Sequence, residues 1–267
     1  MPDFLEVCRR AALAGGEVLL SWRDRFSTRE KASRDLVTDA DLASQAAIRE
    51  ILLTAFPDHD FLGEEVEPLE KRDSTKPPDN GKFRWIVDPL DGTSNYVHGL
   101  QSFAVSIALE AQGQIILGAI YDPIVREFYH GQAGKGAFLN GRRLATSGCQ
   151  IPGDALVAVS FPPHVRRDSV EIHRFIEALF ACQSVRRLGS AALNLAYLAA
   201  GRIDAYWATS VHSWDVAAGV LLVREAGGIV TEIRGGTLDL DQPEFLASAS
   251  PHLHDNMLRV LASAEAQ

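Results

Sequence analysis

Two aspartates three residues apart, Asp88 and Asp91, are the side chains in this sequence whose types and spacing most clearly indicate chemistry. The apolar run of residues 85–87 leads into them, and Pro89 stands between them. Because proline fixes its own φ and restrains the residue before it, the turn is rigid and can direct both carboxylates and the Leu90 carbonyl at one point. Hard cations such as Mg²⁺ prefer oxygen ligands of this kind. The segment therefore predicts a cation site, although Asp-Pro and Asp-Gly pairs also form ordinary turns.

The residues after this turn are suited to binding phosphate. Gly92 lets the backbone approach a ligand closely, and successive amide N–H groups at the start of a helix can hold phosphate oxygens. Thr93 fits two roles, because its hydroxyl can cap that helix or orient a water molecule.

Three further acidic residues can extend the site, and each also has a structural explanation. Glu64 follows a short apolar run, but paired glutamates of this kind are mostly solvated. Asp215 opens a predicted helix, where the helix dipole favours a negative charge by roughly 0.3–1 kcal/mol. Asp41 ends the run of residues 38–41 and fits a capping box. Taken singly, none of the three indicates catalysis.

Two amphipathic helices are predicted at the start of the chain. The first begins near Asp3, with Glu6 completing a capping-box pair, and the second runs from Thr38 to about Phe56, where Pro57 ends it. The residues predicted to be buried are Leu5, Cys8, Ala12 and Leu19 in the first helix and Leu42, Ala46, Ile51 and Ala55 in the second. The polar residues 67–81 indicate a surface loop.

The rest of the chain divides into two patterns of secondary structure. Strand-like runs separated by turns indicate an antiparallel meander; they lie at residues 83–87, 102–110, 115–121 and 126–130. Beyond residues 145–152 strands and helices alternate. The strands are predicted at 155–161, 203–207 and 229–233, with a short one before residue 190, and the helices at 169–180, 190–200 and 214–226. The pattern predicts an α+β fold with two sheets layered between helices, organised as one domain of residues 1–267 whose halves are about 1–147 and 148–267.

Composition narrows the class of protein. The 267 residues carry a net charge of −9, which argues against nucleic acid as the main ligand because a phosphate backbone needs a basic surface. The three cysteines lie far apart and fit neither a zinc site nor a disulfide framework. The absence of a long apolar run and an acidic N-terminal segment predict a cytoplasmic protein with no membrane partner.

Four segments together resemble the inositol monophosphatase family, in the order in which that family carries them. They are residues 35–41, 63–65, 88–95 and 214–219, and they span nearly the whole chain. The resemblance implies an alternating α-β-α-β-α sandwich, a homodimer, two or three Mg²⁺ ions and inhibition by Li⁺. It also implies hydrolysis of a small phosphate monoester, of the inositol 1-phosphate type, to an alcohol and inorganic phosphate by a metal-activated water.

The same resemblance assigns a role to individual residues. One metal would be held by Glu64, Asp88 and the Leu90 carbonyl, a second by Asp88, Asp91 and Asp215, and Glu64 would help to hold a third. Thr93, hydrogen-bonded to Asp41, would orient the attacking water, with Glu64 as the third catalytic residue. The residues implied in substrate binding are Asp91, Gly92, Thr93, Gly189, Ser190, Ala191 and Asp215. Electrostatics agrees with metals here, because two carboxylates about 4 Å apart repel by roughly 4 kcal/mol at an effective dielectric near 20.

One position departs from the family pattern. Members that prefer inositol carry a glutamate that contacts ring hydroxyls, and alignment back from Trp214 places Ala208 there. A methyl group cannot accept those hydrogen bonds, so discrimination in favour of inositol is expected to fall. Histidinol phosphate, a sugar bisphosphate and a nucleotide 3′-phosphate therefore stay open as substrates.

Other interpretations of the sequence stay open beside this one. Residues 37–41 contain the Asp-x-Asp of an aspartyl-phosphate enzyme, but that motif should follow a buried strand rather than open a helix. The carboxylates also fit a non-catalytic protein that binds an ion in order to interact with a partner. Residues 131–136 resemble a nucleotide loop but miss the spacing, and favour a hairpin turn. His252 and His254 are predicted at the surface, and His212 is predicted to pack.

Overall fold

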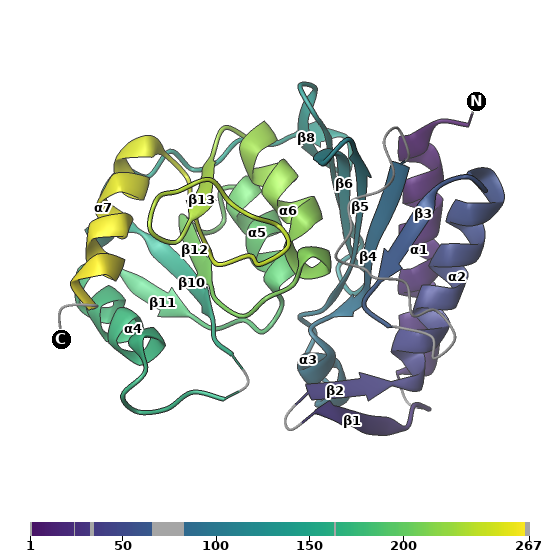
Figure 1. The fold of residues 1–267 in the computed structure, drawn as a ribbon, viewed down its shortest axis with the longest axis horizontal. Helices are drawn as coiled ribbons and strands as arrows, with labels where there is room; N and C mark the ends of the chain where they lie inside the picture. The colour runs from purple at the N-terminus through teal and green to yellow at the C-terminus, as the bar shows by residue number, and fades with distance from the viewer. Residues whose placement is uncertain (1, 24, 33–34, 66–82, 163, 265–267) are drawn as a thin grey trace.

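The computed structural model describes the chain except for residues 1, 24, 33–34, 66–82, 163 and 265–267. Its elements form five layers, which Figure 1 shows side by side. A pair of helices, α1 and α2, covers one face of the first sheet, and the helices α5 and α6 lie between the two sheets. The helices α4 and α7 cover the outer face of the second sheet. The predicted α-β-α-β-α sandwich is confirmed.

The first sheet has seven strands in the order β3-β4-β5-β6-β7-β8-β9. Its strands β3 and β4 are parallel, and every later neighbour is antiparallel, as the predicted meander requires. A separate hairpin is formed by β1 and β2. The strands of this half are β1 (Thr28–Ala32), β2 (Asp35–Thr38), β3 (Asp60–Gly63), β4 (Phe83–Asp91), β5 (Ala104–Ala111), β6 (Gln114–Asp122), β7 (Glu127–Gln132), β8 (Gly136–Leu139) and β9 (Arg142–Arg143). Its helices are α1 (Phe4–Trp22), α2 (Asp39–Ala55) and α3 (Thr93–Val97).

The second sheet has five strands in the order β11-β10-β12-β14-β13. The first three are parallel, and β14 runs antiparallel to both of its neighbours. The strands are β10 (Leu156–Ser160), β11 (Ser184–Arg186), β12 (Ala205–Ala208), β13 (Ile229–Glu232) and β14 (Phe245–Ser248). The helices are the short η1 (Pro152–Asp154), α4 (Val170–Ala181), α5 (Ala191–Ala199), α6 (Ser213–Glu225) and α7 (Pro251–Ser263).

The central helix α6 joins the halves through close packing. Its residues from Val216 to Val223 are all buried, which is expected of a helix enclosed on every side. Gly118 on β6 admits the helix backbone, because a Cβ there would lie 2.7 Å from the Ala218 carbonyl oxygen. Apolar packing against α5 and α6 therefore connects the first sheet to the second.

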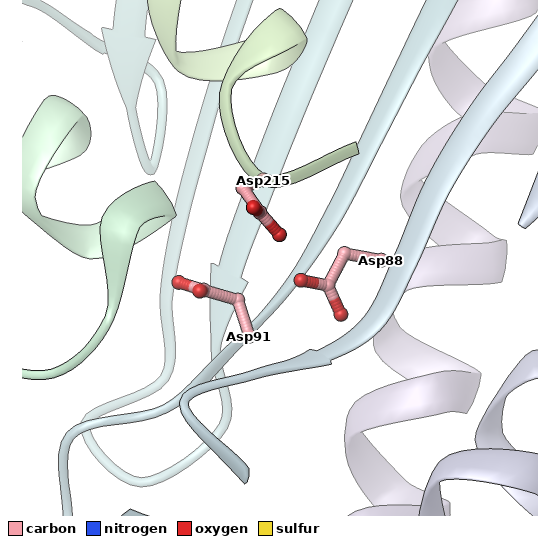
Figure 2. Close-up of side chains that lie close together, drawn as sticks. All are labelled: Asp88, Asp91 and Asp215. Atoms are coloured by element: carbon pink, nitrogen blue, oxygen red, sulfur yellow. The ribbon is translucent and has the colours of Figure 1, made fainter. Parts of the chain in front are cut away.

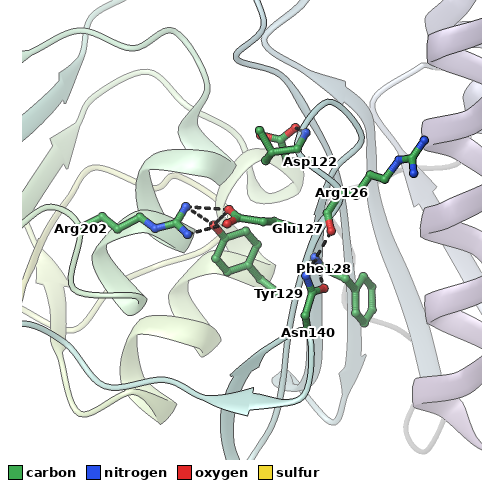
Figure 3. A network of polar contacts seen from close by, with 8 residues as sticks. Asp122, Arg126, Glu127, Phe128, Tyr129, Asn140 and Arg202 are labelled. Atoms are coloured by element: carbon green, nitrogen blue, oxygen red, sulfur yellow. Dashed lines mark hydrogen bonds and ion pairs between the residues drawn. The ribbon is translucent and has the colours of Figure 1, made fainter.

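A polar contact also crosses between the halves, at the end of α5 (Figure 3). The Arg202 guanidinium donates to both carboxylate oxygens of Glu127 on β7 at 2.6 Å. It donates as well to the Tyr129 hydroxyl at 2.9 Å. Because a bidentate pair of this geometry is strong, it lowers the pKa of Glu127.

The bounds of α2 are confirmed, but the face predicted to be buried is wrong. Leu42 is 42% exposed and Ala46 is exposed, while Ile51 and Ala55 are half-buried. The buried residues are Ala40, Asp41, Ser44, Gln45, Ile48 and Leu52. The helix turns a partly polar face inward because those polar side chains bind the segments described below.

The burial of other residues differs from the predictions in smaller ways. In α1, Cys8, Ala12 and Leu19 are buried as predicted, whereas Leu5 is half-buried. His254, predicted at the surface, is 4% exposed, because its ring lies within hydrogen-bond distance of Thr231 and Ser248. The loop predicted at residues 67–81 lies outside the described residues. No helix among the residues described is both long and apolar enough to span a bilayer.

Candidate metal centre and active site

Three aspartates that are distant in the sequence meet between the two halves (Figure 2). Asp88 and Asp91 come from the end of β4, and Asp215 comes from the first turn of α6. Each offers a carboxylate oxygen, and these oxygens lie within 4.8 Å of one another. The two residues of β4 are 1% and 7% exposed, and the Asp215 side chain is 17% exposed. The structure therefore brings together the three aspartates that the family resemblance assigned to the second metal.

A bulge in β4 makes this arrangement possible. In a regular strand, residues three apart point to opposite faces of the sheet. The pairing of β4 with β5 is regular up to Asp88, shifts at Pro89 and Leu90, and resumes at Asp91. The Leu90 amide donates to Asp88 Oδ1 at 2.9 Å, which closes the turn. The proline and the bulge together place both carboxylates on the same side.

Asp91 is held by the start of α5. Its Oδ2 accepts hydrogen bonds from the Ser190 hydroxyl and from the Ala192 amide, the latter at 2.8 Å. Its Oδ1 accepts from the Ala191 amide at 3.2 Å. Helix N-termini carry unpaired N–H groups and a partial positive charge, so this is a favourable place for a carboxylate.

Asp215 combines its structural role with its place in the cluster. It is the third residue of α6, and its Oδ2 accepts from the His212 backbone amide at 2.7 Å. His212 stacks on Trp214, with ring centroids 4.6 Å apart, and its side chain is 65% exposed. Asp215 therefore lies in the first turn of α6, where the helix dipole favours its charge, and this position is compatible with metal binding.

Glu64 lies beside Asp88, one residue past the end of β3. Its backbone amide donates to the Val87 carbonyl at 3.0 Å, which continues the parallel pairing of β3 with β4. The side chains of Glu64 and Asp88 are hydrogen-bonded to each other. A carboxylate pair of this kind shares a proton or a cation.

The electrostatics of the cluster calls for a cation. Burial raises the pKa of Asp88 well above its usual range, and the neighbouring Glu64, Asp91 and Asp215 raise it further. Burial and then Asp215 raise the pKa of Asp91, against the hydrogen bonds from the start of α5. The main causes of both shifts are burial and the neighbouring carboxylates. A buried set of carboxylates that repel one another has the chemistry of a Mg²⁺ site, so the residues present fit that ion.

Thr93 and Asp41 meet, as the sequence resemblance implied. The Thr93 hydroxyl lies 3.3 Å from Asp41 Oδ1 and 3.1 Å from the Leu90 carbonyl oxygen, and donates to one or the other. Asp41 is fully buried, and its Oδ2 accepts from the Thr38 amide at 2.9 Å and the Thr38 hydroxyl at 2.5 Å. The capping box at Asp41 is confirmed, and its second oxygen faces Thr93.

The segment around residue 190 is placed partly against the expectation. Ser190 and Ala191 are buried, and both donate hydrogen bonds to the Asp91 carboxylate. Gly189 is exposed and has a φ of +82°, a conformation that favours glycine. Asn95, which sequence reasoning gave no role, joins this segment to the β4 turn by donating to the carbonyls of Leu188 and Ser102.

Two polar residues of α2 near the site were missed by the sequence analysis. The Ser44 hydroxyl donates to the Pro89 carbonyl, and the Gln45 side chain binds the backbone of Glu65. Neither residue belongs to a motif, and the signal available was only their helical spacing from Asp41. Ala208 is fully buried at the end of β12, where it pairs with Ser160.

The structure also decides between the other interpretations. Residues 131–136 form the hairpin between β7 and β8, and the Glu225 carboxylate accepts from the amides of Gly134 and Gly136. The anion site of this turn is thus filled by the chain itself. Asp39 is the first residue of α2 and follows a strand of a two-stranded hairpin. It binds Ser27 and Arg29 there, so it is not placed as a nucleophile.

Comparison with known proteins agrees with this geometry. The sequence matches the inositol monophosphatase family over residues 3–266. It is 45% identical over 222 residues to an inositol-1-monophosphatase of Mesorhizobium japonicum, covering 81% of this chain and 79% of that protein. It is 38% identical over 253 residues to the Nus factor SuhB of Pasteurella multocida, covering 93% and 92%. An inositol monophosphatase structure from Thermotoga maritima superposes with a TM-score of 0.87 at 30% identity, covering 99% of each chain.

Proposed function

The chain belongs to the inositol monophosphatase family, and from that premise we propose that it hydrolyses a small phosphate monoester to an alcohol and inorganic phosphate in the presence of Mg²⁺. The observation that carries the proposal is the meeting of Asp88, Asp91 and Asp215 within 4.8 Å, with Glu64 beside Asp88. Four carboxylates gathered in this way repel one another and are costly unless divalent cations bind them.

The proposed ligands follow from the positions of these groups. Glu64, Asp88 and the Leu90 carbonyl would hold one ion, Asp88, Asp91 and Asp215 a second, and Glu64 would contribute to a third. Such ions supply positive charge to a bound phosphate dianion and lower the pKa of a water molecule.

The chain itself would orient the attacking water through Thr93. When its hydroxyl donates to Asp41, its lone pairs face away from that carboxylate and can accept a hydrogen bond from water. Asp41 is fixed by two hydrogen bonds from Thr38, so its other oxygen is held in place as an acceptor for the Thr93 hydroxyl. The amides of Gly92 and Thr93 would bind phosphate oxygens, and Asp91 and Asp215 would contact the substrate through the metal.

The alcohol part of the substrate would lie toward Gly189 and the ends of β10 and β12. We place inositol 1-phosphate first because of the family and its named relatives. The buried methyl of Ala208 offers no hydrogen-bond acceptor, so discrimination should be weak and the alternatives are histidinol phosphate, a sugar bisphosphate and a nucleotide 3′-phosphate. A cytoplasmic homodimer sensitive to Li⁺, with one domain per chain, completes the proposal.

A second candidate function rests on a different observation. Relatives at 37–38% identity are named Nus factor SuhB, and these matches cover most of both chains. A role in binding a partner, with the cations serving structure, is therefore the competing proposal. It predicts Mg²⁺ binding without turnover.

The test is phosphate release from a panel of monoesters, with Mg²⁺ and with EDTA. The panel contains inositol 1-phosphate, glycerol 2-phosphate, histidinol phosphate, fructose 1,6-bisphosphate and adenosine 3′,5′-bisphosphate. Asp91→Asn should abolish release, and Asp168→Asn, at an exposed position, should leave it unchanged. Mg²⁺-dependent release supports the hydrolase. Intact Mg²⁺ binding with no release from any ester would reject it in favour of the binding role.

A further inference from the structure

The buried face of α2 carries three polar side chains in a row. Asp41, Ser44 and Gln45 stand at positions i, i+3 and i+4, so they lie on one side of the helix. Asp41 and Ser44 are 0% exposed and Gln45 is 8% exposed. Burying polar groups on a helix is costly unless each is hydrogen-bonded, so the partners of these side chains are informative.

Ser44 reaches the turn that carries the aspartates. Its hydroxyl donates to the Pro89 carbonyl at 3.0 Å, and that carbonyl lies between Asp88 and Leu90. Proline has no N–H group, and the bulge interrupts the ladder here, so strand pairing does not hold this peptide as it holds its neighbours. The hydrogen bond from Ser44 therefore holds the Pro89 carbonyl in the middle of the bulge.

Gln45 holds the other metal-binding segment by its backbone. The Glu65 amide donates to Gln45 Oε1 at 3.0 Å, and Gln45 Nε2 donates to the Glu65 carbonyl. The side-chain amide thus satisfies both hydrogen-bonding groups of one residue, as a neighbouring strand would. On the opposite side, the Glu64 amide donates to Val87. The residue that carries the Glu64 carboxylate is therefore held between β4 and α2.

A glycine, Gly63, lies against the side chain of Gln45. A Cβ at Gly63 would lie 2.1 Å from Gln45 Oε1 and 2.6 Å from its Cδ, distances that no real contact reaches. Gly63 has no positive φ, so a side chain there would be opposed by packing against Gln45 rather than by backbone conformation.

We propose that Ser44 and Gln45 are positioning residues for the metal centre, acting through the backbones of Pro89 and Glu65. The inference rests on the proposed function, because it concerns the same site. Together with Asp41, which binds Thr93, they attach the segments of Glu64, Asp88 and Thr93 to a single helix face. The separation of Glu64 from Asp88 is then set by the spacing of adjacent residues on α2.

A purely structural role, in which these bonds only attach α2 to the sheet, predicts something different. It predicts that removing them lowers stability but leaves the affinity of the folded protein for cations unchanged. Partners behind metal ligands typically change metal affinity or activity by about 10–100-fold when they are removed. A direct measurement of cation affinity therefore distinguishes the positioning role from the purely structural role.

The experiment measures the Kd for Mg²⁺ by calorimetry, and for Mn²⁺ by electron paramagnetic resonance, on the intact chain. Gln45→Met keeps the length of the side chain and removes both hydrogen bonds, and Ser44→Ala removes the bond to Pro89. The matched control is Leu52→Ala, which truncates a fully buried side chain of the same helix about two turns beyond Ser44. Circular dichroism fixes a temperature at which each variant is folded.

We expect Gln45→Met to raise the Kd for both cations about tenfold and Ser44→Ala to raise it about threefold. Leu52→Ala should lower Tm while leaving the Kd within about twofold of the parent. Equal Kd values in the parent, Gln45→Met and Ser44→Ala would overturn the proposal, as would a parent that binds neither cation. If Gln45→Met does not fold, Ser44→Ala carries the test. A parent that binds cations and releases no phosphate would instead reject the proposed reaction, while the Kd series still tests positioning.

Discussion

Replacing Asp215 by asparagine should make the protein more stable when divalent cations are removed. The Asp215 carboxylate accepts a hydrogen bond from the His212 amide and lies against the other two aspartates of the cluster (Figure 2). An asparagine keeps one oxygen for the His212 amide, so the cap of α6 survives. It removes the negative charge and offers an N–H group to its neighbours.

The size of the effect follows from the geometry. Two unit charges 4.8 Å apart repel by about 3.5 kcal/mol at an effective dielectric of 20, and Asp215 faces two such partners. The pKa values of Asp88 and Asp91 are both raised, so protonation already relieves part of this repulsion near neutral pH. The Asp215→Asn variant should therefore gain about 2 kcal/mol in EDTA at pH 8, or roughly 5 °C in Tm.

Thermal melts of the parent and of Asp215→Asn, in EDTA and in excess Mg²⁺, measure this change in Tm. The parent should gain stability from Mg²⁺, because an ion that binds only the folded state raises its Tm. The variant should begin higher in EDTA and gain little from Mg²⁺, so the order of the two proteins reverses. Lower stability of Asp215→Asn in EDTA would show that the carboxylates do not repel one another and would refute the electrostatic reasoning.

Four further predictions follow from the same contacts. Burial raises the pKa of Asp91 to about 7, so the folded state holds this proton more tightly than the unfolded state. The stability of the protein in EDTA should therefore fall as pH rises between about 4 and 7. Thermal melts at about pH 5 and about pH 8 should show that Mg²⁺ stabilises the protein more at the higher pH. Thr93→Ala should lower kcat about 100-fold while calorimetry shows Mg²⁺ binding retained. Ala208→Glu should raise kcat/KM for inositol 1-phosphate about tenfold relative to glycerol 2-phosphate, and equal ratios would contradict the role of this position. Glu225→Ala should cost about 2 kcal/mol in urea unfolding, because the amides of Gly134 and Gly136 lose their acceptor, with no change in Mg²⁺ affinity.

The parts of the fold that could be predicted are those with local causes. The start of α2 is set by Thr38, whose side chain accepts from the Ala40 amide, and its end comes just before Pro57. The strands of the meander alternate with turns that the sequence marks clearly. The strand β14 and the helix α7 were not predicted, because residues 245–263 give only a short apolar run, followed by a helix in which polar and charged residues interrupt the apolar ones.

The inward face of α2 shows why part of the site was unpredictable. Apolar periodicity pointed to Leu42 and Ala46, and both are exposed. The helix is instead rotated so that Ser44 and Gln45 meet the carbonyl of Pro89 and the backbone of Glu65. Those partners are backbone groups, and every residue type offers the same backbone groups. A side chain that binds a distant peptide leaves no pattern in the sequence of either segment.

The position of the two β4 carboxylates also depends on contacts with backbone groups. A spacing of three would send Asp88 and Asp91 to opposite faces of a regular strand, so the sequence alone is compatible with one exposed and one buried carboxylate. The bulge at Pro89 cancels that alternation, and the Ser44 hydroxyl binds the carbonyl of Pro89 within it. The donors at the start of α5 then fix Asp91 from the second half of the chain. The separation of the two carboxylates is thus set by hydrogen bonds from two helices, α2 and α5, to one turn. Removing the hydrogen bonds from either helix should therefore change the affinity for a cation.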